Sequence, residues 1–526
     1  MAGDEAHRCA ERIQGRVIEL SARPISEYAA VRPGLEALAK EAGDTPLPDD
    51  LRAVVRYMLS SALINAAGDA HDRDGLTLGA QWAHDLAHDA ATPIYFVPQA
   101  LYNEANGTLA LFNLAENRSA GVPEDAYPVA DIGYRLRKAG KLGVVRVCLS
   151  AVVNHPVTDP QTRSMAWCNL ANVLDDSGRW VEAYAAYLDA LEADPTNGNA
   201  AGNIAYLLQR RLSQPIGLRG HLAAVYNHYV QLAKSLRART VQIAGEDVAR
   251  LWDRLEPMET EGHFAHDGDE LDDYQQWIVH HRLALAPSVE GLGSHSERWD
   301  SATVSGVAAD VQEPRVPRVF VALNVLKAEY LVARRLAFRG ITMIDESAPL
   351  QHEEDTGTYS ATGDGGFYGE GPATLVLAQR CALDVLDKIA VAANEHFCSG
   401  LNPESVGFSR YWIDAKQTRP ALPDGDPGRR YVLALAELAM DIFGQGMHEA
   451  ANLLRNASTH RLVHVTYGLP TGPTKDTFSS VNVDDLKAAT ISALWVTRAA
   501  YLYFVDLLDT QAPATRLPGL VVPNQL

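Results

Sequence analysis

The sequence predicts an all-α protein in which a solenoid of helical repeats precedes a separate C-terminal helical bundle. Apolar side chains recur every three or four residues through most of the 526 residues, which is the spacing of an amphipathic helix. The string Asn169-Leu170-Ala171 returns as Asn203-Ile204-Ala205, 34 residues later, and such a period is typical of stacked helical pairs. The C-terminal part contains no stretch that alternates like a strand for more than a few residues.

Residues 1–90 are predicted to form an N-terminal helical cap, and residues 91–245 to form the repeats. Small residues at positions 171 and 183 allow two antiparallel helices to approach closely, while bulky ones at 167 and 187 fill the space around them. This unit, Ser164 to Pro195, resembles a tetratricopeptide (TPR) repeat. Its pattern positions are Trp167, Leu170 and Ala171 on the first helix, Gly178 in the turn, Ala183, Tyr187 and Ala190 on the second helix, and Pro195 at its end.

Further copies of the repeat are expected on both sides of this unit. Asn103-Glu104-Ala105-Asn106 echoes the repeated string 66 residues upstream, close to two periods, and Ile132 to Asn154 is expected to form a degenerate helical pair. Three to four repeats are therefore predicted between Pro93 and Thr240. Unrelated amphipathic helices would not give both the spacing and the small residues at matching positions.

The chain after the repeats divides into a connector, a bundle and a tail. Residues 246–315 are acidic, then rich in Gly and Ser, and predict a connector with a short helix around Leu271 to Leu285. Residues 316–512 predict a helical bundle, interrupted by a Gly-rich insertion from Ile341 to Gly371, and residues 513–526 predict a tail. The later helices of the bundle are expected at 373–397, 429–443, 448–464 and 484–509.

Composition favours a soluble, cytoplasmic protein with reduced thiols. The five cysteines are scattered and lack Cys-x-x-Cys spacing, so neither disulfides nor a zinc site is expected. No signal segment opens the chain, and Arg498 and Asp506 interrupt the apolar segment Ile491 to Leu508, so no membrane association is expected. Residues 1–315 hold 28 Lys and Arg against 43 Asp and Glu. The overall charge of −20 therefore belongs mainly to the repeats, which permits RNA binding by the bundle.

The predicted helix at 448–464 holds the string with the most chemical information, Arg455-Asn456-Ala457-Ser458-Thr459-His460. Arg is suited to holding a phosphate and His to moving protons near neutral pH, so the pair suits phosphodiester cleavage. Asn456 and His460 share a helix face, whereas Arg455 and His460 lie about 140° apart and converge only through a kink or a second copy. The residues alone fit equally a solvated, cationic helix end that favours the helix dipole.

The surroundings of this string resemble HEPN domains (higher eukaryotes and prokaryotes nucleotide-binding), whose signature is Arg, a polar residue, three or more variable residues and His. Asp384 to Ala390 is similar to the family's FDKIA segment, and Phe408 to Trp412 is similar to an aromatic string of one bacterial subfamily. In that subfamily the domain follows TPR repeats and a connector. Here the connector has Tyr274-Gln275-Gln276-Trp277 and then Leu283 to Pro287, so the resemblance covers most of residues 93–510.

The resemblance implies a metal-independent endoribonuclease without a cofactor, acting as a toxin or antiviral-defence effector. When the family's roles are carried over, His460 is the general acid/base and Arg455 contacts the phosphate. Asn456 orients His460 or the phosphate. Two motifs would line one cleft in a homodimer formed through the HEPN domain, and a protein or peptide partner at the TPR array would regulate cleavage of RNA. Position 462 is Leu, whereas toxins regulated by tyrosine nucleotidylylation have Tyr there, so that regulation is not expected.

Two other functions remain open at the level of the sequence. One is a non-catalytic TPR/HEPN scaffold that binds proteins or RNA. The other is a hydrolase whose connector holds a metal, although no zincin or EF-hand spacing is present and a solvated acidic connector is the simpler interpretation. The residues for such a metal would be His263, His266, Asp267, Asp269, His280 and His281.

Overall fold

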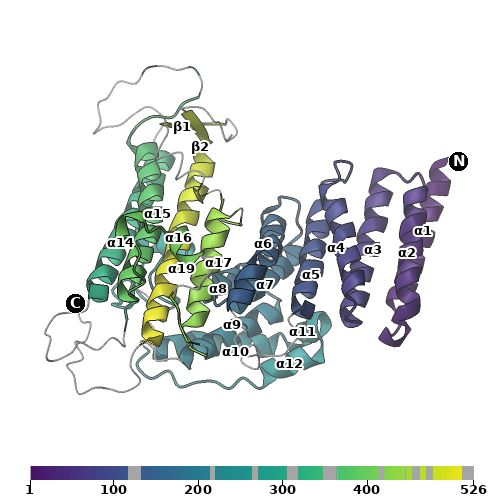
Figure 1. The fold of residues 1–526 in the computed structure, drawn as a ribbon, viewed down its shortest axis with the longest axis horizontal. Coiled ribbons are helices and arrows are strands. Elements are labelled where there is room, and N and C mark those ends of the chain that lie inside the picture. Colours follow the sequence, from purple (N-terminus) through teal and green to yellow (C-terminus); the bar gives the residue numbers. More distant parts are fainter. Residues whose placement is uncertain are drawn as a thin grey trace.

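A computed structural model describes the protein over residues 2–115, 132–213, 219–263, 270–304, 318–346, 360, 363, 365–413, 420–423, 425–444, 446–449, 451–452, 462–468 and 478–511. The described part of the chain is mostly helical, with 73% of its residues in helices, which confirms the predicted all-α class. Figure 1 shows a row of upright helices on the N-terminal side and a bundle at the other end, with a small sheet at the tip of the bundle.

The row of helices α1 to α10, called the array below, is built from neighbours that pack antiparallel in sequence order. Each helix turns one apolar face towards its neighbours, as amphipathic helices do. The helices are α1 (Ala2–Ser21), α2 (Tyr28–Asp44), α3 (Asp49–Asp69), α4 (Arg73–His88), α5 (Val97–Ala115), α6 (Ile132–Asn154), α7 (Pro160–Asp176), α8 (Trp180–Ala193), α9 (Gly198–Leu212) and α10 (Arg219–Ser235). The shorter α11 (Arg237–Ala244), α12 (Glu246–Asp253) and α13 (Asp273–His280) follow.

The unit predicted from Ser164 to Pro195 forms the antiparallel pair α7 and α8. Ala171 and Ala183, the small residues expected where the helices meet, are fully buried. Gly178 in the turn has a φ of +76°, which glycine adopts without strain. A Cβ at Gly178 would also lie 2.5 Å from the Arg430 side chain of the bundle. The turn glycine therefore serves the repeat and the approach of the C-terminal helices.

Two helix predictions were wrong. Ile132 to Asn154 is the single helix α6 and not a helical pair, because isolated glycines such as Gly140 and Gly143 each disfavour a helix by only about 1 kcal/mol. The helix expected at 448–464 does not reach its predicted end, because Leu462–Thr466 is a strand. Its sequence, Leu-Val-His-Val-Thr, alternates apolar and polar residues from Val463 onwards and is rich in β-branched side chains, which favour strands.

The C-terminal bundle consists of α14 (Arg318–Glu346), α15 (Glu370–His396), α16 (Phe408–Trp412), α17 (Arg429–Phe443) and α19 (Val483–Thr510). Helix α19 packs against α14, α15 and α17, and it is the central element of the bundle. Among the described residues it is the one helix long and apolar enough to cross a membrane, yet 83% of its most apolar window is buried inside the protein. Its apolar character is therefore that of a core helix.

A two-stranded parallel sheet lies at the tip of the bundle, beyond the ends of α14, α15 and α19 (Figure 1). Strand β1 (Leu462–Thr466) pairs in register with β2 (Phe478–Asn482), so that Leu462 lies opposite Phe478. The inner face of the sheet packs in a small apolar cluster that includes Val465, Val481 and Ile344 of α14. The sheet thus fixes the chain that follows residue 461 to the end of the bundle.

Candidate functional site

The three residues of the sequence motif, Arg455, Asn456 and His460, lie outside the described residues. The structure describes the chain on either side of the motif, at 446–449, 451–452 and 462–468. These flanking segments fix where the motif segment begins and where it ends. The site is defined by the two anchors of the motif segment and by the array to which one of them is attached.

The segment before the motif is anchored to both the bundle and the array. Gln379, fully buried in α15, donates its side-chain amide to the carbonyl of Ala451 at 2.7 Å. His448, which is 8% exposed, lies with Nε2 3.2 Å from a carboxylate oxygen of Glu182 on α8. The chain therefore enters the motif directly from a buried contact with the array.

The segment after the motif is anchored by the sheet. Nε2 of His464 on β1 lies 3.0 Å from the hydroxyl of Tyr368, and the two rings are stacked. Beside them is an open, mainly apolar cavity of about 520 Å³. Leu462 and Leu377, two of its lining residues, are more than half exposed. The outer surface here combines aromatic and aliphatic side chains next to the end of the motif segment.

A buried ionic network joins the array to the bundle upstream of the motif. Arg146 on α6 donates two hydrogen bonds to Asp441 on α17, at 2.7 and 2.9 Å, and a third to Glu437 at 3.0 Å. Arg179, at the turn between α7 and α8, donates to Asp441 and pairs with Glu182. All five side chains are almost completely buried.

The network holds the carboxylates of Asp441 and Glu182 in the charged form. Burial by itself raises the pKa of Asp441, but the attraction of Arg146 and Arg179 outweighs it and keeps that pKa below the ordinary value. Burial likewise raises the pKa of Glu182, and Arg179 and His448 lower it by more. Breaking such a network is costly because an unpaired buried charge remains.

A second buried ion pair joins α9 to the central helix of the bundle. Arg211 donates two hydrogen bonds to Asp506 of α19, at 2.8 and 2.9 Å, and its guanidinium lies over the ring of Trp180. The indole N–H of Trp180 also donates to Asp506, at 2.7 Å. The array and the bundle therefore share buried charge pairs that involve α6, α9 and the turn before α8.

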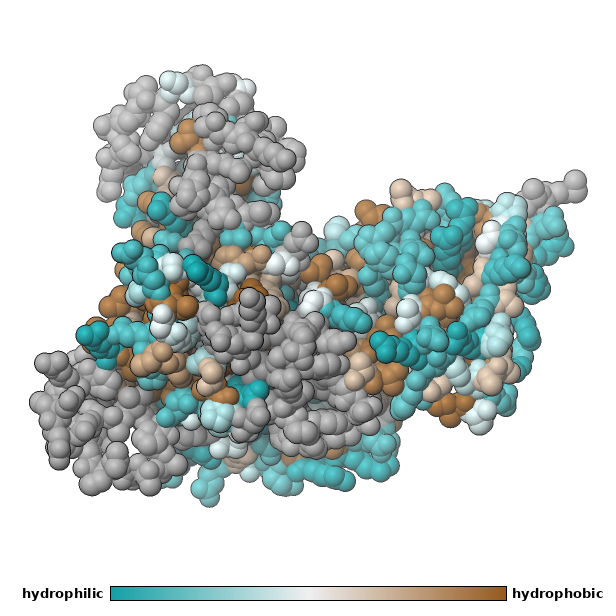
Figure 2. Space-filling model, viewed as in Figure 1, coloured by the Kyte–Doolittle hydropathy of each residue, from teal (hydrophilic) through white to brown (hydrophobic). Residues whose placement is uncertain are grey.

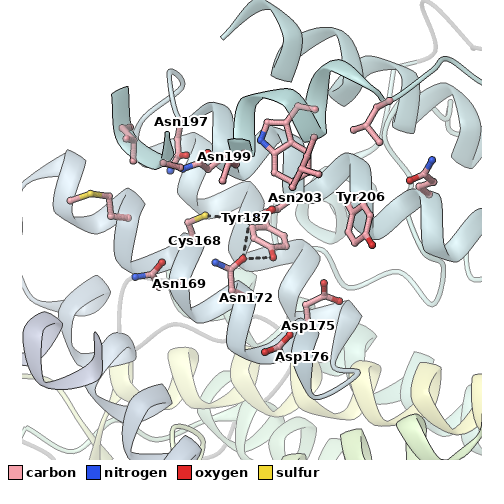
Figure 3. A pocket seen from close by; sticks show the side chains of 18 of the residues that line it. Cys168, Asn169, Asn172, Asp175, Asp176, Tyr187, Asn197, Asn199, Asn203 and Tyr206 are labelled. Atoms are coloured by element: carbon pink, nitrogen blue, oxygen red, sulfur yellow. Dashed lines mark hydrogen bonds between the residues drawn. The ribbon is translucent and has the colours of Figure 1, made fainter. Parts of the chain in front are cut away.

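The array also contains a groove of about 800 Å³, bounded by α7, α9, α11 and α12 (Figure 3). Amides along the groove are linked across alternate helices of the array, α5, α7 and α9. The side-chain N–H of Asn203 donates to Asn172 at 2.9 Å, and that of Asn169 donates to Asn106 at 3.1 Å. Tyr187 also donates to Asn172, at 2.7 Å. The 34-residue repetition of Asn169 and Asn203 thus places amides along one groove.

Several buried polar atoms of groove-lining residues have no hydrogen-bond partner among the described residues. They include a carboxylate oxygen of Asp175 on α7, the side-chain carbonyl of Asn199 on α9 and the indole N–H of Trp252 on α12. A buried polar group without a partner is unfavourable by about 1–3 kcal/mol. These atoms lie beneath the surface of the groove, so the side-chain amides of Asn172 and Asn203 are the groups that the groove offers to a ligand.

The metal ligands proposed for the connector are only partly described. His266, Asp267 and Asp269 lie outside the described residues. Nδ1 of His263 lies 3.2 Å from Nδ1 of His221 on α10, and His280 packs against its neighbour His281. Within the described part of the chain, no group close enough to share an ion is found in the connector, and the one such group lies elsewhere, on α4 and α5.

The ionic network, the groove and this His-containing group were all missed from the sequence. The partners in the network are 260 to 295 residues apart where they cross from the array to α17, so no local pattern signals it. The repeated asparagines were the available signal for the groove. A His-x-x-x-His spacing at 84 and 88 was the signal for the third feature.

The C-terminal segment is of the helical-bundle class, with a motif-bearing segment between α17 and β1. Residues 311–511 match the family model described as LA2681-like HEPN. The match thus gives an LA2681-like HEPN domain at these residues, and it contains the motif and both of its anchors. It covers less than half of the chain, and the helices of the array lie outside it. No curated protein matches the chain.

Proposed function

We propose that this protein is an endoribonuclease whose HEPN domain cleaves RNA without a metal. The observation that carries the proposal is the HEPN match over residues 311–511, within which Arg455, Asn456 and His460 reproduce the Arg-polar-x-x-x-His spacing. HEPN domains are typically ribonucleases. The role as a toxin or antiviral-defence effector is part of the same proposal.

The proposed chemistry is attack of the RNA 2′-hydroxyl on the adjacent phosphate. The O2′–P bond forms, the P–O5′ bond breaks, and the products end in a 2′,3′-cyclic phosphate and a 5′-hydroxyl. His460 moves the proton, and Arg455 stabilises the charge that develops on the phosphate. Asn456 orients His460 or the phosphate. Two copies of the motif would face each other across a homodimer; a strict monomer in sedimentation experiments would contradict this arrangement.

The decisive comparison uses wild type, His460→Ala and Arg455→Ala on total cellular RNA in EDTA, with the cleaved ends mapped. We expect cleavage by wild type, cyclic phosphate ends, and a loss of at least about 100-fold in each variant because proton transfer or charge stabilisation is removed. His7→Ala, on the exposed face of α1, is the matched control and should cleave like wild type.

Equal cleavage by all four proteins would remove the motif from the mechanism. Binding of RNA without cleavage by wild type would favour the alternative, a non-catalytic scaffold. Cleavage abolished by EDTA would instead favour a metal-dependent hydrolase.

The array is proposed to act as the regulatory part of the protein, through a TPR-like groove that binds an extended peptide. A peptide backbone carries one N–H donor and one C=O acceptor per residue. The side-chain amides of Asn172 and Asn203, which line the groove, carry the matching donor and acceptor groups. The buried contact between Glu182 of α8 and His448 provides a direct route from a partner at the array to the motif segment.

Removal of the groove amides should weaken peptide binding. Peptides enriched from a random displayed library against the full chain should bind the Asn172→Ala/Asn203→Ala double variant at least about tenfold more weakly, because hydrogen-bonding groups in the groove are lost. Asn154→Ala, an exposed amide of α6 that bonds its own helix, is the control. Equal affinity for the double variant and wild type would place the peptide site outside this groove.

A further inference from the structure

Three side chains near the start of the array form a compact group, and all three are of types that bind metal ions. His84 and His88 are four residues apart on α4, and Glu104 lies opposite them on α5. One ligand atom from each of the three lies within 4.8 Å of the others. His residues at i and i+4 share a helix face, so both imidazoles are presented on the same side of α4.

The hydrogen bonds of the two imidazoles suit a bound ion. Nδ1 of His88 lies 2.9 Å from the backbone carbonyl of His84, so it donates there and leaves Nε2 as the ligand atom. Nδ1 of His84 lies 2.9 Å from a carboxylate oxygen of Glu104. Neighbouring ligand atoms around tetrahedral zinc are about 3.4 Å apart, so an ion can replace the proton shared by these two atoms after a small opening.

An unpaired buried oxygen provides a second, independent observation. Glu104 is only 7% exposed, and its second carboxylate oxygen has no hydrogen-bond partner among the described residues. The thiol of Cys148 on α6 lies beside the Glu104 carboxylate. A buried carboxylate without full compensation is unfavourable, and a divalent cation would relieve it.

We propose that His84, His88 and Glu104 form a binding site for a divalent transition metal of the zinc class. Two imidazoles and one carboxylate are the ligand set that zinc takes when a fourth position stays open. Both imidazoles are on the exposed side of the group, so that the fourth position is available to water or to a ligand from a partner. The ion links α4 to α5, where the predicted N-terminal cap meets the repeats.

The test uses the full chain after removal of metal with EDTA and desalting, titrated with Zn²⁺ by calorimetry and with Co²⁺ by absorption. We expect about one equivalent of Zn²⁺ at this site. The His84→Ala/His88→Ala double variant and Glu104→Gln should each bind at least about tenfold more weakly, because side chains that contact the ion directly are lost. His7→Ala removes an exposed histidine of α1 and should leave binding unchanged.

A second readout excludes a folding artefact. Without metal, the double variant should unfold somewhat below the temperature of wild type, because both histidines are exposed but His84 contacts the buried Glu104 carboxylate. With Zn²⁺, wild type alone should gain thermal stability, since an ion that binds only the native state stabilises it. Equal Zn²⁺ affinity of wild type and the double variant, or no Zn²⁺ bound by wild type, would overturn the proposal. The nuclease assay is carried out in EDTA, so the two proposals fail independently.

Discussion

Replacing Arg146 with Met should lower the free energy of unfolding by about 3–5 kcal/mol, the range expected when one partner of a buried ion pair is removed. Arg146 is fully buried and donates to both Asp441 and Glu437. Its loss leaves Glu437 with the Ser177 hydroxyl as its remaining described partner. Urea unfolding followed by tryptophan fluorescence measures the change, because Trp180 lies in the same interface.

Two controls separate this effect from the loss of an ordinary ion pair. Arg237→Met removes an exposed arginine that pairs with Asp253 and Glu246, and it should leave the unfolding midpoint unchanged because water screens these charges. Adding Glu437→Gln to Arg146→Met should recover part of the lost stability, because the second substitution removes the unpaired charge. A double variant less stable than the single one would show that packing around Arg146, and not charge, dominates.

Most helices of this protein could be predicted from the sequence, because an apolar periodicity of three to four residues indicates a buried helix face. The helix predicted at 429–443 matches α17 at both ends. The helix predicted at 484–509 differs from α19 by one residue at each end. The unit at 164–195 was readable for a second reason, since the close contact of two helices restricts which residues fit there. The HEPN match over 311–511 agrees with the resemblance drawn from the motif.

The interface and the sheet could not be predicted in the same way. The sequence alone predicts solvent exposure for Arg146, Arg179 and Glu182, because charged residues are usually exposed. Only the packing of α6 and α8 on the bundle buries them. Strand β1 was missed because its five residues are too short for periodicity to separate from a helix end. Its pairing with β2 is a tertiary contact with no local signature.

The interface between the array and the bundle should become less stable as the pH falls below about 4.5. The direction of this change follows from the pKa of Glu182. The pairing with Arg179 and His448 holds this pKa below its ordinary value of 4.5 in the folded protein. The unfolded chain therefore binds more protons than the native state in this range, so stability is present above pH 4.5 and is lost below it. Asp441, whose pKa is also lowered, contributes in the same direction from about 3.8 downwards.

Glu182→Gln isolates this contribution, because glutamine resembles a protonated glutamate in shape and charge. At pH 7 the variant should be less stable than wild type, since Arg179, His448 and Tyr503 all contact the Glu182 carboxylate. The stability difference should narrow between pH 5 and pH 3, because the unfolded wild-type chain takes up a proton at Glu182 in this range while the folded protein does not. Urea unfolding at several pH values measures it, and each unit of pKa shift corresponds to about 1.4 kcal/mol.

Asp189→Asn is a control for which the stability of wild type relative to the variant should change with pH in the opposite direction. Burial raises the pKa of Asp189 above its ordinary value, even though Arg282 pairs with it. The folded protein then binds more protons at this position than the unfolded chain, so wild type gains stability relative to Asp189→Asn as the pH falls. A Glu182→Gln difference that stayed constant or widened in acid would mean that the Glu182 carboxylate is not stabilised by its cationic partners. The coupling proposed from the array to the motif through Glu182 and His448 would then lose its electrostatic basis.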